Sequence, residues 1–278
     1  MKRKCKLVSL FGTKEWAVAT MNAFKGCENS CAYCYAQANF SRYDKDFAKV
    51  KDIPVAKDWD KFIKDFKSKC RKAKGVGRVM FPSTHDITPL TLNYCIKALK
   101  HMLEFENNRF EFLIVSKPRK DCIEKLCKNL DGYKERILFR FTIGSADDAV
   151  LKFWEPGASS FEERLECVKY AFKKGFRTSI SIEPRLDDNT EAVIKSVRPF
   201  VTDAIWLGSA NKMKFRLKMN GCADEAHLKE SEKLEGLNSK VKAKELFAKW
   251  GNDTKIKWKE SLKKVLGLPL STKKGEDI

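Results

Sequence analysis

Hydrophobic positions along the chain follow two spacings in turn, and this alternation predicts a repeated order of strand and helix. Short apolar runs of strand length occupy residues 16–21, 78–81, 110–115, 136–143, 177–182 and 203–207. Segments between them carry apolar residues three and four apart, the spacing of one helix face. These segments span residues 32–47, 59–73, 90–105, 120–130, 161–172 and 191–197. Strands that alternate with helices form parallel sheets with right-handed crossovers, so the predicted fold class is α/β.

The six strand-then-helix units predict an incomplete barrel. The chain has no G-x-G-x-x-G segment, which argues against an open dinucleotide-binding sheet. We therefore expect a partial (β/α)6 barrel of the TIM type over residues 1–210, with its chemistry at the carboxyl ends of the strands. The pattern weakens after this point. Over residues 211–278 we expect a C-terminal extension made of a cap loop, two basic helices and a frayed tail, at 211–235, 240–250, 255–266 and 271–278.

The net charge adds a class of partner to this picture. The 278 residues include 56 basic and 37 acidic side chains, for a formal charge of +19. Such a field attracts polyanions, so DNA or RNA is an expected partner, although lysine spread along the whole chain also fits a generally basic composition. No apolar run is long enough to span a bilayer, and the first residues lack the apolar segment of a signal peptide. We expect a cytoplasmic protein that does not enter the membrane.

Three of the ten cysteines form the candidate metal centre. Cys27, Cys31 and Cys34 follow one another at C-x3-C-x2-C spacing. A [4Fe–4S] cube takes four protein thiolates when saturated, so three leave one iron open, and an open position is typical of catalytic metal centres. The alternative is a zinc site, which usually pairs two Cys or Cys/His knuckles; here the first histidine is His85. Most of the other, scattered cysteines are expected to be small buried hydrophobic residues.

This cysteine spacing, with Tyr33 directly before Cys34, resembles the signature of the radical S-adenosylmethionine (SAM) superfamily. The resemblance implies that Cys27, Cys31 and Cys34 hold a [4Fe–4S] cluster whose free iron binds SAM. It further implies that one electron cleaves SAM to a 5′-deoxyadenosyl radical, which abstracts hydrogen from a substrate. A reductase such as flavodoxin or ferredoxin would supply that electron. Tyr33 is expected near the adenine.

Further segments resemble spore photoproduct lyase and its photolyase-like relatives, from about residue 24 to residue 185. They are the E-P-G-x-S-S-F-x-E-R turn and the segments at the ends of the expected strands, at 155–164, 34–35, 83–87, 114–117 and 139–145. The resemblance implies that Lys117 and Ser145 help to hold SAM. Asp86 would bind its amino group. Glu183 follows the fifth expected strand, so it could meet the ribose of SAM or the substrate, or be only a polar residue at the strand end.

Within the same turn, Glu155 and Arg164 are expected to form a structural ion pair; the alternative is that they contact the substrate.

One position departs from that family. The lyase returns hydrogen from a second-strand cysteine, together with tyrosines at the last cluster cysteine. Here Ser83 occupies the position of that cysteine and is expected to contact SAM. Tyr33 and Tyr35 are present as candidate catalytic residues. A serine O–H bond is too strong to donate a hydrogen atom readily. Either Tyr35 or another thiol, such as Cys222, takes over, or the reaction differs; we favour a different substrate.

The predicted function is therefore that of a radical SAM enzyme, of lyase or oxidoreductase type, acting on a nucleic acid or nucleotide. One alternative keeps the enzyme and replaces the substrate by a peptide or small metabolite. Another is a non-catalytic iron–sulfur protein that binds nucleic acid.

Overall fold

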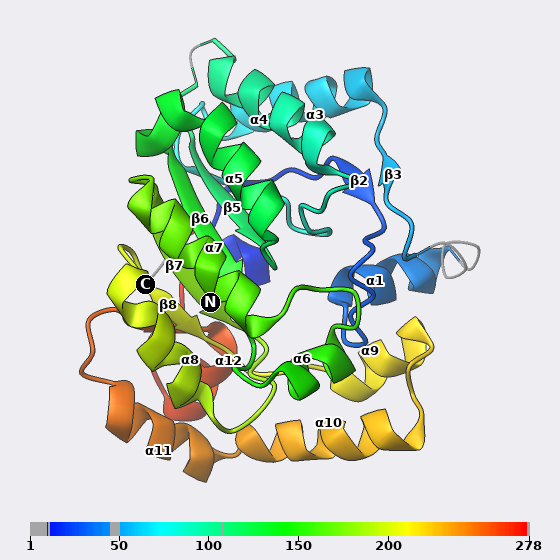
Figure 1. Ribbon diagram of the computed structural model, residues 1–278, viewed down its shortest axis with the longest axis vertical. Coiled ribbons are helices and arrows are strands. Elements are labelled where there is room, and N and C mark those ends of the chain that lie inside the picture. Colours follow the sequence, from blue (N-terminus) through cyan, green and yellow to red (C-terminus); the bar gives the residue numbers. More distant parts are fainter. Residues whose placement is uncertain (1–9, 11, 45–50, 107, 277–278) are drawn as a thin grey trace, which may run out of the picture.

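A seven-stranded sheet forms the centre of the molecule, and helices lie around its outer face (Figure 1). The computed structural model describes residues 10, 12–44, 51–106 and 108–276. The strands run in the order β1 Ala19–Thr20, β4 Arg78–Phe81, β5 Glu111–Ser116, β6 Ile137–Thr142, β7 Arg177–Ile182, β8 Ile205–Leu207 and β9 Ile256–Trp258. Every neighbouring pair is parallel. The predicted α/β class is confirmed, and the sheet is consistent with a partial TIM-type barrel.

The helices of the described chain are α1 Tyr35–Tyr43, α3 Trp59–Lys72, α4 Leu92–Glu104, α5 Lys120–Asn129, α6 Asp148–Trp154, α7 Phe161–Lys173, α8 Thr190–Val197, α9 Met213–Asn220, α10 Glu225–Leu237, α11 Lys240–Trp250 and α12 Glu260–Leu266. The helices predicted between the first six strands are present as α1, α3, α4, α5, α7 and α8 and begin close to their expected residues, whereas α6, α9 and α10 were not predicted. Asp58 and Ser160 cap α3 and α7 through side-chain oxygens that accept a backbone N–H of the first turn. A small antiparallel pair, β2 Phe24–Lys25 with β3 Val55–Ala56, stands apart from the main sheet. The prediction for residues 45–47 lies outside the described residues.

Side chains alternate between the two faces of each strand, and the two faces have different surroundings. In β6, Phe139 and Phe141 belong to the large core under the helices, whereas Leu138 belongs to a separate cluster inside the barrel. Both faces are covered, so strands such as β5 and β6 have nearly continuous apolar sequences. The inner face also carries the fully buried Arg140.

Two tryptophans and two cations fill the interior of the barrel. The rings of Trp16 and Trp206 meet edge to face, with their centroids 5.7 Å apart. The Arg140 guanidinium lies 4.6 Å and 5.2 Å from those centroids, and the Lys259 ammonium lies 3.9 Å from that of Trp16. At these distances the cations are attracted to the ring faces. These groups close the barrel beneath the carboxyl ends of the strands.

The C-terminal extension differs from its prediction. The expected loop at 211–235 contains α9 and α10, and the expected helix at 255–266 begins with the strand β9. Ile256 pairs with Ile205 of β8, and Ile256 and Trp258 turn their buried side chains to the outer core. Three residues are too few for a period to distinguish strand from helix, which explains the error. The boundary at residue 210 stays a prediction, although β9 completes the sheet from beyond it.

The described part of the expected tail, residues 271–276, is also ordered against the N-terminal segment. Ser271 is buried, and its carbonyl accepts the N–H of Leu10. Gly275 N donates to the carbonyl of Lys14. The prediction of a frayed tail was therefore wrong for these residues. Across the described residues, no helix combines the length and apolarity needed to cross a membrane.

The tryptophan pair gives a test of the interior packing. We expect Trp206→Ala to lower the free energy of unfolding by about 3–5 kcal/mol, because the side chain is fully buried and its loss leaves a cavity. Urea unfolding would measure the change. The matched control is Trp250→Ala on α11, whose side chain is only partly buried. Equal losses in the two variants would contradict this account of the interior.

Candidate functional site

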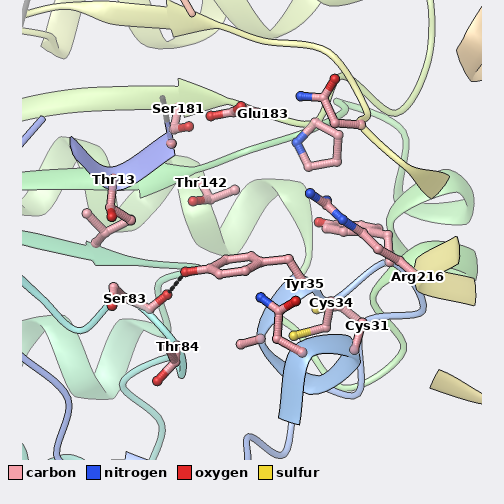
Figure 2. A pocket seen from close by; sticks show the side chains of 18 of the residues that line it. Thr13, Cys31, Cys34, Tyr35, Ser83, Thr84, Thr142, Ser181, Glu183 and Arg216 are labelled. Atoms are coloured by element: carbon pink, nitrogen blue, oxygen red, sulfur yellow. Dashed lines mark hydrogen bonds between the residues drawn. The ribbon is translucent and has the colours of Figure 1, made fainter. Parts of the chain in front are cut away.

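The carboxyl ends of the strands open into a cavity of about 1270 Å³. The cysteine loop between β2 and α1, the strand ends, α9, and the N-terminal turn Gly12–Glu15 all contribute to its wall (Figure 2). The predicted site residues that line it are Cys27, Cys31, Tyr33, Cys34, Tyr35, Ser83, Asp86, Lys117 and Glu183. Ser145 is the exception, so the structure gathers the other predicted residues at one place.

The cysteine loop presents three free thiols to the cavity. Cys27 and Cys31 are buried, and Cys34 begins α1 as its N-cap. The N–H of Asp86 donates to the sulfur of Cys27 at 3.5 Å, and the N–H of Gln37 donates to that of Cys34 at 3.5 Å. Hydrogen bonds to cluster sulfurs are one of the means by which a protein tunes an iron–sulfur centre.

Three free thiols that line one cavity are the ligand type that an iron–sulfur cluster takes. Nowhere in the described ranges do three Cys, His, Asp or Glu side chains gather closely enough to hold one ion. A mononuclear site needs its ligands in one coordination sphere, whereas a cube binds each thiolate at a different iron and so spreads them. Burial raises the pKa of Cys27 to about 12, and a coordinated metal removes such a proton outright.

The E-P-G turn is joined to the cysteine loop by backbone hydrogen bonds. Gly157 N donates to the carbonyl of Asn29 at 3.1 Å, and Ala32 N donates to that of Trp154 at 2.9 Å. A Cβ at position 157 would lie 2.3 Å from the carbonyl oxygen of Glu28, closer than any side chain can approach. Only glycine lets the two backbones meet here. The two motifs recognised separately in the sequence therefore form one unit.

A buried ion pair holds that unit together. Arg164 donates to Glu155 at 2.6 Å, and neither side chain is exposed, which confirms the predicted structural pair. The phenol of Tyr33 donates to the other oxygen of Glu155. Burial, together with the Glu155 carboxylate, raises the pKa of Tyr33 well above its ordinary value, so the phenol stays protonated. Tyr33 thus offers its ring to the cavity while its hydroxyl is bound beneath the loop.

Opposite charges lie beside Cys27. The Lys117 ammonium is 3.6 Å from one oxygen of Asp86, and the backbone N–H of Lys117 donates to the other at 2.8 Å. Asn29 donates its side-chain amide to the same carboxylate at 2.8 Å. Burial opposes ionisation of Asp86, but the Lys117 ammonium and these N–H donors outweigh it and hold the pKa of Asp86 below its usual value. The site therefore presents an ammonium and a carboxylate side by side.

Tyr35 reaches across the cavity to the end of β4. Its hydroxyl donates to the backbone carbonyl of Ser83 (Figure 2). The hydroxyl of Ser83 instead pairs with Asn22, whose amide donates to it at 3.0 Å. Glu183, after β7, lines the same space. The structure thus brings Tyr35 and the serine position into contact.

Two candidate residues lie away from the cavity lining. Ser145 is fully buried, and its hydroxyl donates to Asp187 rather than facing the cavity. The thiol of Cys222 points to the carbonyl of Asn220 at 3.6 Å and does not line the cavity. As placed here, neither side chain has direct access to a ligand in this space.

Several contributors had no signal in the sequence. Asn220 at the end of α9 donates to the carbonyls of Ala32 and Cys34, at 2.8 Å and 3.1 Å, and so holds the cysteine loop in place. Its Asn-Gly sequence reads as a turn. Arg216 on α9 lines the cavity beside Tyr35, with 5.9 Å between the guanidinium and the ring centroid. These residues belong to the segment whose helices were missed.

Known proteins resemble this chain at the level of family and fold. The family model of the radical SAM superfamily matches residues 21–195. An uncharacterised protein of Acidianus two-tailed virus is 25% identical over 189 residues, covering 63% of this chain and 57% of the viral protein. An uncharacterised protein of Methanocaldococcus jannaschii is 23% identical over 210 residues, covering 72% of this chain and 75% of its own length.

Two solved structures share the fold at lower identity. Spore photoproduct lyase with bound AdoMet and dinucleoside spore photoproduct is 18% identical, with a TM-score of 0.54, over 79% of this chain and 64% of the lyase. Streptococcus suis SuiB bound to the precursor peptide SuiA is 12% identical, with a TM-score of 0.55, over 93% of this chain and 54% of SuiB. The chain spans less than two thirds of the viral protein and of both structures. The family implies a [4Fe–4S] cluster and SAM, and with well over half of its residues matched, this chain belongs to the radical SAM superfamily of enzymes.

Proposed function

We propose that Cys27, Cys31 and Cys34 bind a [4Fe–4S] cluster, and that the enzyme uses SAM beside it to abstract hydrogen from a nucleic acid or nucleotide. When bound, the cluster supplies the electron that cleaves SAM into methionine and the 5′-deoxyadenosyl radical. The main support for this function is that three thiols and the Asp86–Lys117 pair line one cavity at the carboxyl ends of the strands. Flavodoxin or ferredoxin as electron donor, and a cytoplasmic location, stay predictions.

The paired charges are complementary to the amino-acid end of SAM. Lys117 would bind the carboxylate of SAM and Asp86 its ammonium, because each SAM group then meets the opposite charge. All four groups would form one hydrogen-bonded cluster. The ring of Tyr33, 5.8 Å from the Lys117 ammonium, would lie near the adenine. Ser83 and Glu183 line the remaining wall and complete the proposed binding surface. The predicted contact from Ser145 is not part of this proposal.

Positive charge at the cavity supports a polyanionic substrate. Arg42, Lys212 and Arg216 line it, on a chain of net charge +19, whereas the lining residue Lys264 is paired with Glu260. The Arg216 guanidinium makes no hydrogen bond or ion pair with the described part of the chain, so its donors are available to a ligand phosphate. Enzymes that act on a base move it out of the stack into such a pocket. A peptide or small-metabolite substrate has no need of this field.

The cluster assignment can be tested on the radical-forming half of the reaction. After anaerobic reconstitution and reduction with dithionite, the unaltered protein should release 5′-deoxyadenosine from SAM, and Cys31→Ala should abolish it. The control is Cys70→Ala, a buried thiol of α3 in the outer core. Chromatography of the quenched reaction measures the product. A Cys31→Ala protein that still makes 5′-deoxyadenosine would refute the assignment.

The backbone contact beneath the cysteine loop makes a second prediction. Gly157→Ala should displace the loop, because its Cβ would overlap the Glu28 carbonyl. We expect iron bound per chain after reconstitution to fall to less than half, with the barrel still folded by circular dichroism. Gly132→Ala is the matched control, since its Cβ would meet nothing within 4 Å. Full iron loading in Gly157→Ala would contradict the account.

The substrate class can be tested by salt dependence. Binding of short single-stranded DNA or RNA, followed by fluorescence anisotropy, should weaken steeply as salt rises. Arg216→Gln should weaken it further and lower the salt slope by about 1, as expected for one lost phosphate contact. Lys229→Gln, an exposed lysine of α10 away from the cavity, is the control. Salt-independent binding, or none, would favour the peptide or metabolite alternative.

A further inference from the structure

Two helices beside the cavity carry basic residues and no acidic ones. α1 and α9 pack against each other, and side chains of both line the cavity (Figure 1). Neither Tyr35–Tyr43 nor Met213–Asn220 contains an Asp or a Glu. The Lys214 ammonium of α9 is paired, because it lies 3.1 Å from Glu232 of α10. The remaining cations of this region have no such neighbour on either helix.

Three of these cations make no ion pair with the described part of the chain. They are Arg42 of α1, Arg216 of α9 and Lys212, the residue before α9, and all three line the cavity. The Glu183 carboxylate also attracts Arg216, but it is shared with the Lys259 ammonium 3.8 Å away. The cavity side of α1 and α9 therefore has positive charge available to an anionic ligand.

Exposed aromatic rings accompany these cations. Phe215 lines the cavity and is 41% exposed, and Tyr43 at the end of α1 is 82% exposed. The Arg42 guanidinium lies 5.5 Å from the centroid of the Tyr43 ring, and Figure 2 shows Arg216 beside Tyr35. A ring left open to water forgoes the burial that stabilises most aromatic residues, and a ligand that stacks on it restores that burial. We call Arg42, Tyr43, Lys212, Phe215 and Arg216 the mouth face.

Unpaired cations next to open ring faces match a polyanion that also carries flat apolar groups. A guanidinium or ammonium binds a phosphate, and an exposed ring stacks on any unpaired base, since every base has a π face. A duplex covers its base faces in its own stack, and a phospholipid headgroup offers charge without a ring. We propose that the mouth face binds a single-stranded segment of nucleic acid, with bases on Tyr43 and Phe215 and phosphates at the three cations. This inference rests on the proposed nucleic-acid substrate and names the form in which it is bound.

The length of α1 sets how far the bound strand extends. Tyr35 and Tyr43 begin and end this helix, which separates them by about 12 Å at a rise of 1.5 Å per residue. A nucleotide held in the cavity at Tyr35 and Arg216 does not reach Tyr43, so further nucleotides of the strand make that contact. Tyr43 therefore contributes to the binding of an oligonucleotide and not to that of a mononucleotide.

Fluorescence anisotropy of a labelled single strand of about 12 nucleotides, within the usual range of site sizes, tests the proposal. The protein is reconstituted and carries SAM under anaerobic conditions. Phe215→Ala and Tyr43→Ala should each weaken binding by roughly 5- to 100-fold. Neither should change the salt slope, unlike Arg216→Gln, because a ring contacts no phosphate. Phe172→Ala on α7 is the matched control and should bind normally, since that ring is 42% exposed and does not line the cavity.

Each other outcome overturns a defined part of the argument. If the single strand binds and both ring variants bind it equally well, the mouth face is wrong and the nucleic-acid substrate stands. The same holds if a duplex of that sequence binds as tightly as the single strand. If no nucleic acid binds while 5′-deoxyadenosine still forms, the substrate class and the mouth face both fail. A glutamate–tyrosine peptide that competes as well as unlabelled oligonucleotide would overturn the proposal in favour of an acidic peptide.

Two measurements separate a lost contact from a damaged protein. Unchanged melting temperature and SAM affinity would show that Phe215→Ala is folded. If it is not, Tyr43→Ala decides alone, because that side chain is largely exposed. It must weaken the oligonucleotide and leave a 5′-mononucleotide unaffected; an equal effect on both ligands, or on neither, would refute the proposal.

Discussion

The buried pair of Glu155 and Arg164 is the interaction on which the candidate site depends. Burying two charges is costly unless their remaining hydrogen-bonding positions are satisfied. Here the Tyr33 phenol takes the second carboxylate oxygen, and the guanidinium also donates to the carbonyls of Ser159 and Thr142. The pair therefore ties the E-P-G turn, the end of β6 and the cysteine loop to one another. A change to either charge would leave the other buried and alone, so the loop and the turn form a single mechanical unit.

The contacts that position the rest of the candidate site begin at this unit. The turn presents Gly157 to the backbone at Asn29, and the Asn29 amide in turn binds Asp86. Asp86 then accepts the N–H of Lys117 while its own N–H meets the sulfur of Cys27. A chain of direct contacts thus runs from a structural ion pair to the charges proposed to bind SAM. The positions of those charges do not depend on exposed surface loops, because every residue in this chain of contacts is buried or half-buried.

The sequence predicts the parts of this arrangement that have a local signature. Strands such as β5 and β6 are covered on both faces and therefore appear as apolar runs. The cluster cysteines are recognisable from their C-x3-C-x2-C spacing. By contrast, β9 is three residues long and adjoins a helix, so its Ile-Lys-Trp sequence has no readable period. Asn220 reaches the Cys34 carbonyl from 186 residues away, and no local pattern encodes such a contact. Glu15 and Lys259 meet only because β9 closes the sheet beside the N-terminal turn.

If the proposed reaction returns a hydrogen atom to its product, the side chains that line the cavity limit the possible source. Among the described residues that line it, the cysteines are those of the loop, Cys27, Cys31 and Cys34. If all three bind iron, as proposed, no lining thiol is left to donate a hydrogen atom. The Ser83 hydroxyl is engaged with Asn22, and an alcohol O–H is a poor donor in any case. Tyr35 places a phenol, whose O–H bond is weaker, against that same position. We therefore propose Tyr35 as the hydrogen source for such a step; the alternative is a reaction that differs from that of the lyase.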